Sequence, residues 1–446
     1  MRRITALSAA ILTALSLNAQ AINLSDVYQD ALENDYQLKI AQAELNATLE
    51  GEEEAWAGVR PAVTAGGSLM RHELDGYDTS SYNSTGLSVG VTQTLFDTSS
   101  YNSTGLSVGV TQTLFNSVKF QQIGVAEASS AQARFSFREA EMDLMVRVTE
   151  AFFQVLKAKD SLTSAQAQEK AIKRQLEQAQ QQFKVGLIPI TGVNEAQAAY
   201  DASRATRIGA EGALLISEES LQLLTGKSYD QMDGLVDSFP VIDPQPASVQ
   251  HWIDLALSNS PAVKAAQQQK DVARLGVDVA QAAFLPYVDA KAQVAYSDTS
   301  TKSSATDLSF GLEMGWQIYT GGATSANIRR LGHYLNQSEQ SLELQKRSAA
   351  LNTRTQYIQV TTSVEQVEAR RQALISSESA LKATRSGYEV GTRNIVDVLQ
   401  AEQAYFTAET AYLNTRYDYL ISLIKLKQAA GTLKPEDISG LDQWLQ

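Results

Sequence analysis

Residues 185–200 read VGLIPITGVNEAQAAY, and residues 390–405 read VGTRNIVDVLQAEQAY. The two stretches lie 205 residues apart, and the same offset pairs Gly226 with Gly431, so about forty residues repeat without a gap. Each copy begins with a Val-Gly break and continues with a helical pattern. The chain therefore contains two copies of one structural unit, which we place at 22–224 and 251–430.

A second internal match lies nearer the start of each repeat. Ala31-Leu32-Glu33-Asn34 corresponds to Ala256-Leu257-Ser258-Asn259, and Pro61 corresponds to Pro286, both at an offset of 225 residues. A helical pattern rich in Ala and Gln precedes each proline and is expected to end there, because proline disfavours the helical conformation of the residue before it. After the proline, apolar and polar residues begin to alternate with a period of two, which is typical of a strand.

Each repeat is predicted to contain a hairpin of strands, within 62–115 and within 287–319. From Asp307 to Tyr319, apolar residues alternate with small or polar ones, and Val288 to Tyr296 alternates likewise. The polar stretch from Ser297 to Thr306 is expected to join the two strands. Strands of about 10 residues suffice to cross a bilayer at a tilt. The edge of a soluble sandwich would show the same local pattern.

The first repeat carries a tandem duplication, since residues 78–96 are identical to residues 97–115. Removing one 19-residue copy makes the two hairpin regions nearly equal in length. A chain that returns to its own side of a membrane needs an even number of strands. We therefore expect one copy to be extruded, with the surplus residues in a longer external loop; a duplication without function is the alternative.

Long helices are predicted after each hairpin, over 116–184 and 323–389, each on the order of 100 Å long. Their thin apolar stripes are typical of coiled-coil packing. Tip turns follow at 185–190 and 390–394, and return helices follow at 191–224 and 395–430, which makes two antiparallel helical hairpins. The segments 225–250 and 431–446 are interpreted as a small mixed α/β equatorial region.

The remaining composition narrows the class of protein. Residues 1–21 combine Arg2 and Arg3, an apolar run and a small-residue end, which predicts a cleaved secretory signal. The chain has no cysteine and a net charge of −13, which argues against disulfides, an acylated cysteine and a nucleic-acid partner. Three scattered histidines and the absence of catalytic motifs predict no metal, no cofactor and no enzymatic activity.

Four strands of membrane length cannot close a barrel, and an open sheet edge in lipid leaves backbone groups unpaired. Chains must therefore associate. Three chains give twelve strands, the smallest reasonable count that leaves a water-filled lumen. The predicted fold class is thus a homotrimer in which a 12-stranded membrane β-barrel continues into an α-helical barrel of coiled-coil hairpins.

The mature chain resembles the TolC family of outer-membrane efflux proteins. The resemblance is carried by the paired tip motifs, the Ile395-to-Leu399 run, Ala199-Tyr200 and Ala404-Tyr405. The resemblance implies a trimeric channel-tunnel in the outer membrane of a Gram-negative bacterium, extending into the periplasm. It implies docking to a periplasmic adaptor and an inner-membrane pump. It also implies multidrug efflux or type I secretion, in which drugs, toxins or proteins leave through a passive, gated duct.

In that family, polar contacts between helical hairpins hold the periplasmic end shut. The resemblance places the gate tyrosine at Tyr388, the gate arginine at Arg393, the acidic ring at Asp397 and the partner threonine at Thr191. The turns that meet the adaptor fall on Val185, Gly186, Leu187, Val390, Gly391 and Thr392.

Two positions depart from the family pattern. The gate aspartate after the threonine is Gly192 here, and the second acidic ring position is Gln400. Arg393 therefore lacks its usual carboxylate, and we expect a gate that is held less tightly or whose contacts have moved to Glu195 or Glu389. The alternative function is a periplasmic coiled-coil adaptor or structural surface protein without a pore.

Overall fold

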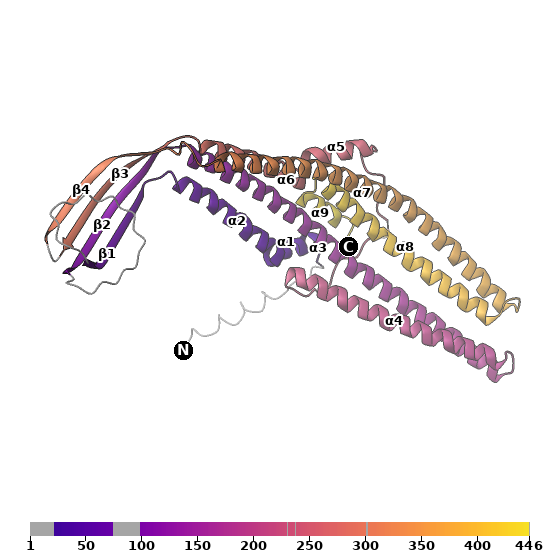
Figure 1. Ribbon diagram of the computed structural model, residues 1–446. Coiled ribbons are helices and arrows are strands. Elements are labelled where there is room, and N and C mark those ends of the chain that lie inside the picture. Colours follow the sequence, from indigo (N-terminus) through magenta and orange to yellow (C-terminus); the bar gives the residue numbers. More distant parts are fainter. Residues whose placement is uncertain (1–21, 75–98, 230, 237, 300–301, 446) are drawn as a thin grey trace, which may run out of the picture. The chain divides into compact units, whose positions relative to one another are not determined.

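The computed structural model describes residues 22–74, 99–229, 231–236, 238–299 and 302–445. It separates into two compact units, a helical unit and a sheet unit (Figure 1). The helical unit holds the described residues of 1–45, 132–267 and 341–446, and the sheet unit holds those of 46–131 and 268–340. The predicted secretory signal and the first copy of the duplicated segment, 78–96, lie outside the described residues.

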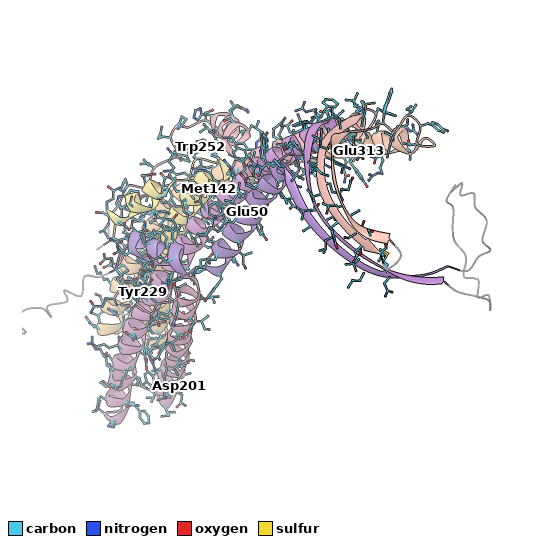
Figure 2. All side chains as sticks on the ribbon, turned by 90° about the vertical axis from the view of Figure 1, so that its left-hand side faces the viewer. Glu50, Met142, Asp201, Tyr229, Trp252 and Glu313 are labelled. Atoms are coloured by element: carbon cyan, nitrogen blue, oxygen red, sulfur yellow. The ribbon has the colours of Figure 1, made fainter. Side chains whose placement is uncertain are left out.

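The sheet unit is built on one antiparallel sheet with strand order β1-β2-β3-β4, curved along its strands (Figure 2). The strands are β1 (Ala62–Leu74), β2 (Ser99–Asn116), β3 (Tyr287–Thr299) and β4 (Lys302–Gly315). β2 of the first repeat pairs with β3 of the second, so both repeats share one sheet. In the described part of the chain, β1 and β4 are the free edges of this sheet.

The alternation of side chains makes one face of the sheet apolar. Its rows contain, in register, Val110, Ala292 and Phe310, followed by Val108, Val294 and Leu308. The opposite face carries small and polar residues in the intervening row, namely Gly109, Gln293 and Ser309. Phe310 is 85% exposed and Leu308 is 68% exposed, so no described residue of the chain covers this apolar face as a core.

Both strands of the second hairpin lie within the predicted range 287–319, but the limits predicted for its second strand were wrong at both ends. β4 is not the stretch Asp307 to Tyr319: it begins at Lys302, where it pairs with Thr299, and ends at Gly315. Residues 303–306 belong to this strand and have exposed side chains, and the alternation of apolar residues does not mark them. Beyond Gly315 the indole nitrogen of Trp316 donates to the Phe284 carbonyl at 2.9 Å, and the chain leaves the sheet.

The duplicated segment contributes one strand from its second copy. Residues 99–115 form most of β2, and this strand runs directly into the following helix, which begins at Ser117. The copy that pairs with both β1 and β3 is thus the one next to the helix. The predicted external loop falls on the first copy and stays a prediction.

Helices make up the rest of the described chain. They are α1 (Leu24–Asn34), α2 (Tyr36–Ala57), α3 (Ser117–Lys184), α4 (Ile190–Thr225), α5 (Val249–Asn259), α6 (Pro261–Ala282), α7 (Ala323–Glu389), α8 (Ile395–Ala429) and α9 (Pro435–Asp442). In the helical unit α4 runs beside α3, and α8 runs beside α7 (Figure 1). Of the helices in the described ranges, none combines the length and apolarity required to cross a membrane.

The first helix of each repeat is broken at one equivalent residue, which sequence periodicity did not show. Asp35 separates α1 from α2, and Ser260 separates α5 from α6, at the repeat offset of 225 residues. Asp35 has φ −65° and ψ 120°, and Ser260 has φ −54° and ψ 122°, so neither continues the helix. Both donate their N–H to the carbonyl four residues earlier. Asp35 also accepts a hydrogen bond from the Leu38 N–H at 2.7 Å, which caps α2.

The core of the helical unit lies where α1, α3, α8 and α9 meet. Phe152, Phe153 and Tyr417 are almost fully buried, and their rings lie 5.7 Å apart in each adjacent pair. Asp442 of α9 accepts from the Leu24 N–H at 3.0 Å, which joins the two ends of the described chain. In the equatorial segments the described residues form isolated bridges and not extended strands.

Candidate functional site at the helical hairpin tips

The two tip turns have the same backbone geometry, built around a glycine. Gly186 has φ +76° and Gly391 has φ +80°, a left-handed conformation that side chains with a Cβ resist. Leu187 N–H donates to the Gln182 carbonyl at 2.9 Å, and Thr392 N–H donates to the Gly387 carbonyl at 2.8 Å. These bonds close the last turns of α3 and α7 as Schellman motifs, so each Val-Gly break ends a helix.

Apolar side chains project from both turns. Val185 is 70% exposed, Leu187 is 73% exposed and Val390 is 75% exposed. An isolated exposed apolar residue is ordinary, but three on two equivalent turns form a small apolar rim. The predicted docking residues therefore lie on the surface in a single chain.

The hydroxyl of Tyr388 donates to Gln182 Oε1, which connects the end of α7 to the end of α3. Both side chains line a pocket between the two tips, together with Thr191, Glu195 and Arg393. Thr191, the predicted partner threonine, makes no hydrogen bond to Tyr388 in the described residues. Gln182 is thus a contact that the sequence did not reveal. Glutamines are frequent along α3, and nothing in the sequence singles this one out.

Asp397 has a structural role that was not predicted. Its carboxylate accepts from the Asn394 N–H at 3.1 Å, and its own N–H donates to Asn394 Oδ1 at 2.9 Å. This reciprocal pair is a capping box at the start of α8. The spacing Asn-x-x-Asp in the sequence could have predicted this capping box. Asp397 is only half-buried in the single chain, so the cap and an acidic ring are compatible.

Replacing Asn394 by Ala is expected to fray the start of α8, because the capping box loses one of its two hydrogen bonds. The expected cost is about 1 kcal/mol. Hydrogen exchange of the amides of residues 395–398 should become faster in Asn394→Ala. Amides at the start of α4, which has no side-chain cap in the wild type, serve as the control and should not change.

Arg393 folds back over the end of α7. A Cβ added to Gly387 would lie 2.8 Å from Arg393 Cγ, so the glycine makes room for the arginine stem. Its guanidinium forms no ion pair with any residue of the described ranges. Glu195 lines the same pocket from α4, whereas Glu389 does not line it.

Gly192 is buried, and its surroundings are apolar. A Cβ there would meet Ile188 Cδ1 and Ile395 Cγ2, each at 3.4 Å. Behind it lies a small core that we call the tip cluster, made of Ile172, Leu176, Ala179, Ala196, Ile395 and Leu399. The two hairpins of one chain are therefore held together at the tip by apolar packing, at the place where the family pattern has a carboxylate.

Comparison with known proteins places this architecture in one family. The family model described as outer membrane efflux protein matches residues 27–227 and 252–432, the two repeats. The outer membrane protein TolC of Vibrio cholerae is 31% identical over 448 residues, covering 98% of this chain and 97% of that protein. The alkaline protease secretion protein AprF of Pseudomonas aeruginosa is 30% identical over 455 residues, covering 98% and 90%.

Solved structures show the same fold at low identity. The CmeC outer membrane channel of Campylobacter jejuni superposes with a TM-score of 0.77 at 15% identity, covering 95% of this chain and 90% of that one. The MtrE outer membrane channel of Neisseria gonorrhoeae gives 0.72 at 18% identity, covering 93% and 90%. The predicted fold class is confirmed at the level of the single chain. The chain belongs to the outer membrane efflux protein family.

Proposed function

We propose that this protein is the outer-membrane exit duct of a tripartite efflux or type I secretion system, passive and gated at its periplasmic tip. The observation that carries the proposal is the four-stranded sheet, which has one exposed apolar face and two free edges in the described chain. Such a face fits lipid, while the polar face fits a water-filled lumen. The duct does no covalent chemistry and needs no cofactor.

The free edges support a homotrimer. In lipid, the backbone groups of β1 and β4 must find partners, and the sheets of three copies closed edge to edge supply them. The helical unit offers matching seams, because exposed apolar residues recur every seven positions on two helices. They are Ile208 and Leu215 on α4, and Leu344, Leu351 and Ile358 on α7. A spacing of seven is typical of coiled-coil contacts with a neighbouring helix.

The apolar rim of the tips supports docking to a periplasmic adaptor, which in turn meets an inner-membrane pump. Its members Val185, Leu187 and Val390 are exposed and stand on backbone turns that glycine and Schellman hydrogen bonds hold in place. The relative named for alkaline protease secretion favours proteins as one class of cargo, and the family name favours efflux of small molecules.

We assign closure of the duct to Tyr388, Arg393, Asp397 and Thr191 on neighbouring tips. Within one chain the guanidinium of Arg393 has no ion pair in the described residues, so in the trimer it is free to meet a carboxylate of the next copy. Besides Asp397, the carboxylates near the tips are Glu195, which lines the same pocket as Arg393, and Glu389, at the end of α7. Three copies of Asp397 around the constriction favour cations over anions.

Single-channel conductance of the purified protein in a planar bilayer tests this proposal, with the wild type measured beside Arg393→Ala. A small, cation-favouring conductance is expected in the wild type, and an increase of severalfold is expected in the variant, because exposed pairs of this kind each contribute only about 0–1 kcal/mol. The control is Arg371→Ala, which removes an arginine paired within α7.

Each other result has a definite meaning. A protein that stays soluble in the periplasm and forms no pore would support the adaptor or surface-protein alternative and contradict the duct. A pore that is equally large in the wild type and in Arg393→Ala would show that Arg393 does not close it.

A further inference from the structure

Below the tip cluster, α8 carries a carboxylate that is fully buried. The side chain of Glu402 has 0% exposure. Its Oε1 accepts from Arg385 Nη2 of α7 at 2.7 Å and from Gln175 Nε2 of α3 at 3.2 Å. Oε1 thus accepts both hydrogen bonds. The two donors come from different helical hairpins, Arg385 from the second and Gln175 from the first.

The second oxygen of the same carboxylate has no hydrogen bond. Glu402 Oε2 is buried without a partner in the described residues, and so is Gln175 Oε1. Both atoms can only accept hydrogen bonds, so neither can satisfy the other. A buried acceptor without a donor costs free energy, and a half-satisfied buried network is less stable than an apolar packing of the same volume.

The free-energy cost of the unpaired oxygen arises only while the two hairpins are packed together. Glu402 lies three residues after Leu399, and Gln175 directly precedes Leu176; both leucines belong to the tip cluster. Arg385 lies in the same hairpin as Glu402 and is 44% exposed, so this ion pair does not need α3. When α8 moves away from α3, the carboxylate keeps its arginine and its free oxygen gains water. The tip cluster, in contrast, loses apolar contacts.

We propose that Glu402 is an opening element of the duct, a buried charge that makes the closed packing of α8 on α3 less stable than an apolar side chain would. The inference rests on the proposed function, in which the hairpin tips close the duct. The tip cluster stabilises the closed arrangement and Glu402 destabilises it, so the free-energy difference between the closed and the open arrangement becomes smaller. Glu402 therefore sets how readily a docked partner separates the hairpins.

Glu402→Gln is the sharpest test, because the new amide nitrogen can donate to Gln175 Oε1 while the new Oε1 accepts from Arg385. The packed arrangement then gains a hydrogen bond and loses a buried charge. Amide hydrogen exchange in residues 396–405 is expected to slow by about threefold to tenfold, as one added buried hydrogen bond predicts. Single-channel conductance or open probability is expected to fall.

The matched control is Glu368→Gln. It removes one carboxylate from the same hairpin, but Glu368 is exposed, and its hydrogen bonds and ion pair are with Arg371, three residues later on α7. It controls for the loss of charge and should change neither readout. The protein is used as the full chain in detergent for exchange and in a bilayer for conductance.

The outcomes separate this inference from the proposed function. Faster exchange or a larger conductance in Glu402→Gln would show that Glu402 holds the duct closed, and would overturn the proposal. Slower exchange with no pore in any variant would overturn the duct and leave the role of Glu402 in helix packing standing. A pore with unchanged conductance and exchange would overturn the role of Glu402 alone.

Discussion

Phe310→Arg is expected to prevent stable insertion of the protein into the outer membrane. Phe310 is 85% exposed on the apolar face of β4 and lies in register with Ala292 of β3. An arginine on a lipid-facing strand costs about 2–4 kcal/mol near the middle of the bilayer. In a trimer the cost applies to each chain, so its total approaches the whole stability of an ordinary domain.

The measurement is the amount of protein in purified outer membranes and the fraction that migrates as a trimer. Both should fall to a small part of the wild-type level. Ser309→Arg, one residue earlier and on the opposite face, places the same charge toward the lumen and should insert normally. Equal losses in the two variants would mean that the apolar face of the sheet does not contact lipid.

Asp35→Ala is expected to cause a large loss of stability in the helical unit. The carboxylate of Asp35 is 4% exposed and accepts two hydrogen bonds from Arg147 of α3, at 2.9 and 3.0 Å. Removing it leaves the guanidinium, which is 22% exposed, with Asp143 alone, and leaves the start of α2 uncapped. Breaking a buried pair by removing one partner costs about 3–5 kcal/mol.

Urea unfolding followed by far-ultraviolet circular dichroism gives the loss as a shift of the midpoint. Glu368→Ala is the control, since its pair with Arg371 is exposed on both sides and should contribute about 0–1 kcal/mol. A midpoint for Asp35→Ala within the range of the control would contradict the assigned role of the Asp35–Arg147 pair.

The same pair predicts a dependence of stability on pH. Burial acts to raise the pKa of Asp35, but the hydrogen bonds from Arg147 and the Leu38 N–H, with the arginine charge, outweigh it and hold the pKa below its ordinary value. The folded protein therefore binds a proton at Asp35 less readily than the unfolded chain. The stabilisation is complete above the ordinary aspartate pKa of about 4 and is lost as the pH falls through the lower, folded value. In Asp35→Ala this part of the acid dependence should disappear.

Much of the architecture followed from patterns that are local in the sequence. The Val-Gly breaks at 185 and 390 coincide with left-handed glycines, because few other residues tolerate that backbone. The alternating apolar residues that precede Gly315 share one face of β4, because side chains alternate along any strand. Where both faces are polar, as between Lys302 and Asp307, alternation carries no information and the strand limit was missed.

The candidate site was predicted less completely, since its contacts join distant residues. The resemblance directed attention to Tyr388, but its hydrogen-bond acceptor Gln182 lies 206 positions away in the chain. Asp397 was interpreted only as a ring charge, although its local spacing to Asn394 already indicated a cap. The effect of Gly192 also depends on distant packing, because Ile395 lies beside it.

The sequence by itself determined the two-fold plan, the amphipathic strands, the long helices and the tip turns. Each of these depends on residues within a few positions of one another or on direct internal repetition. Only the tertiary structure decided that β2 pairs with β3, that Asp35 meets Arg147, and that Glu402 is buried against Gln175, 227 positions earlier. The physical reason is that burial and hydrogen-bond satisfaction belong to the assembled helices. From the sequence, an isolated glutamate in a helical pattern is expected to be a solvated charge. Only the packing of the helices around it shows that water cannot reach it.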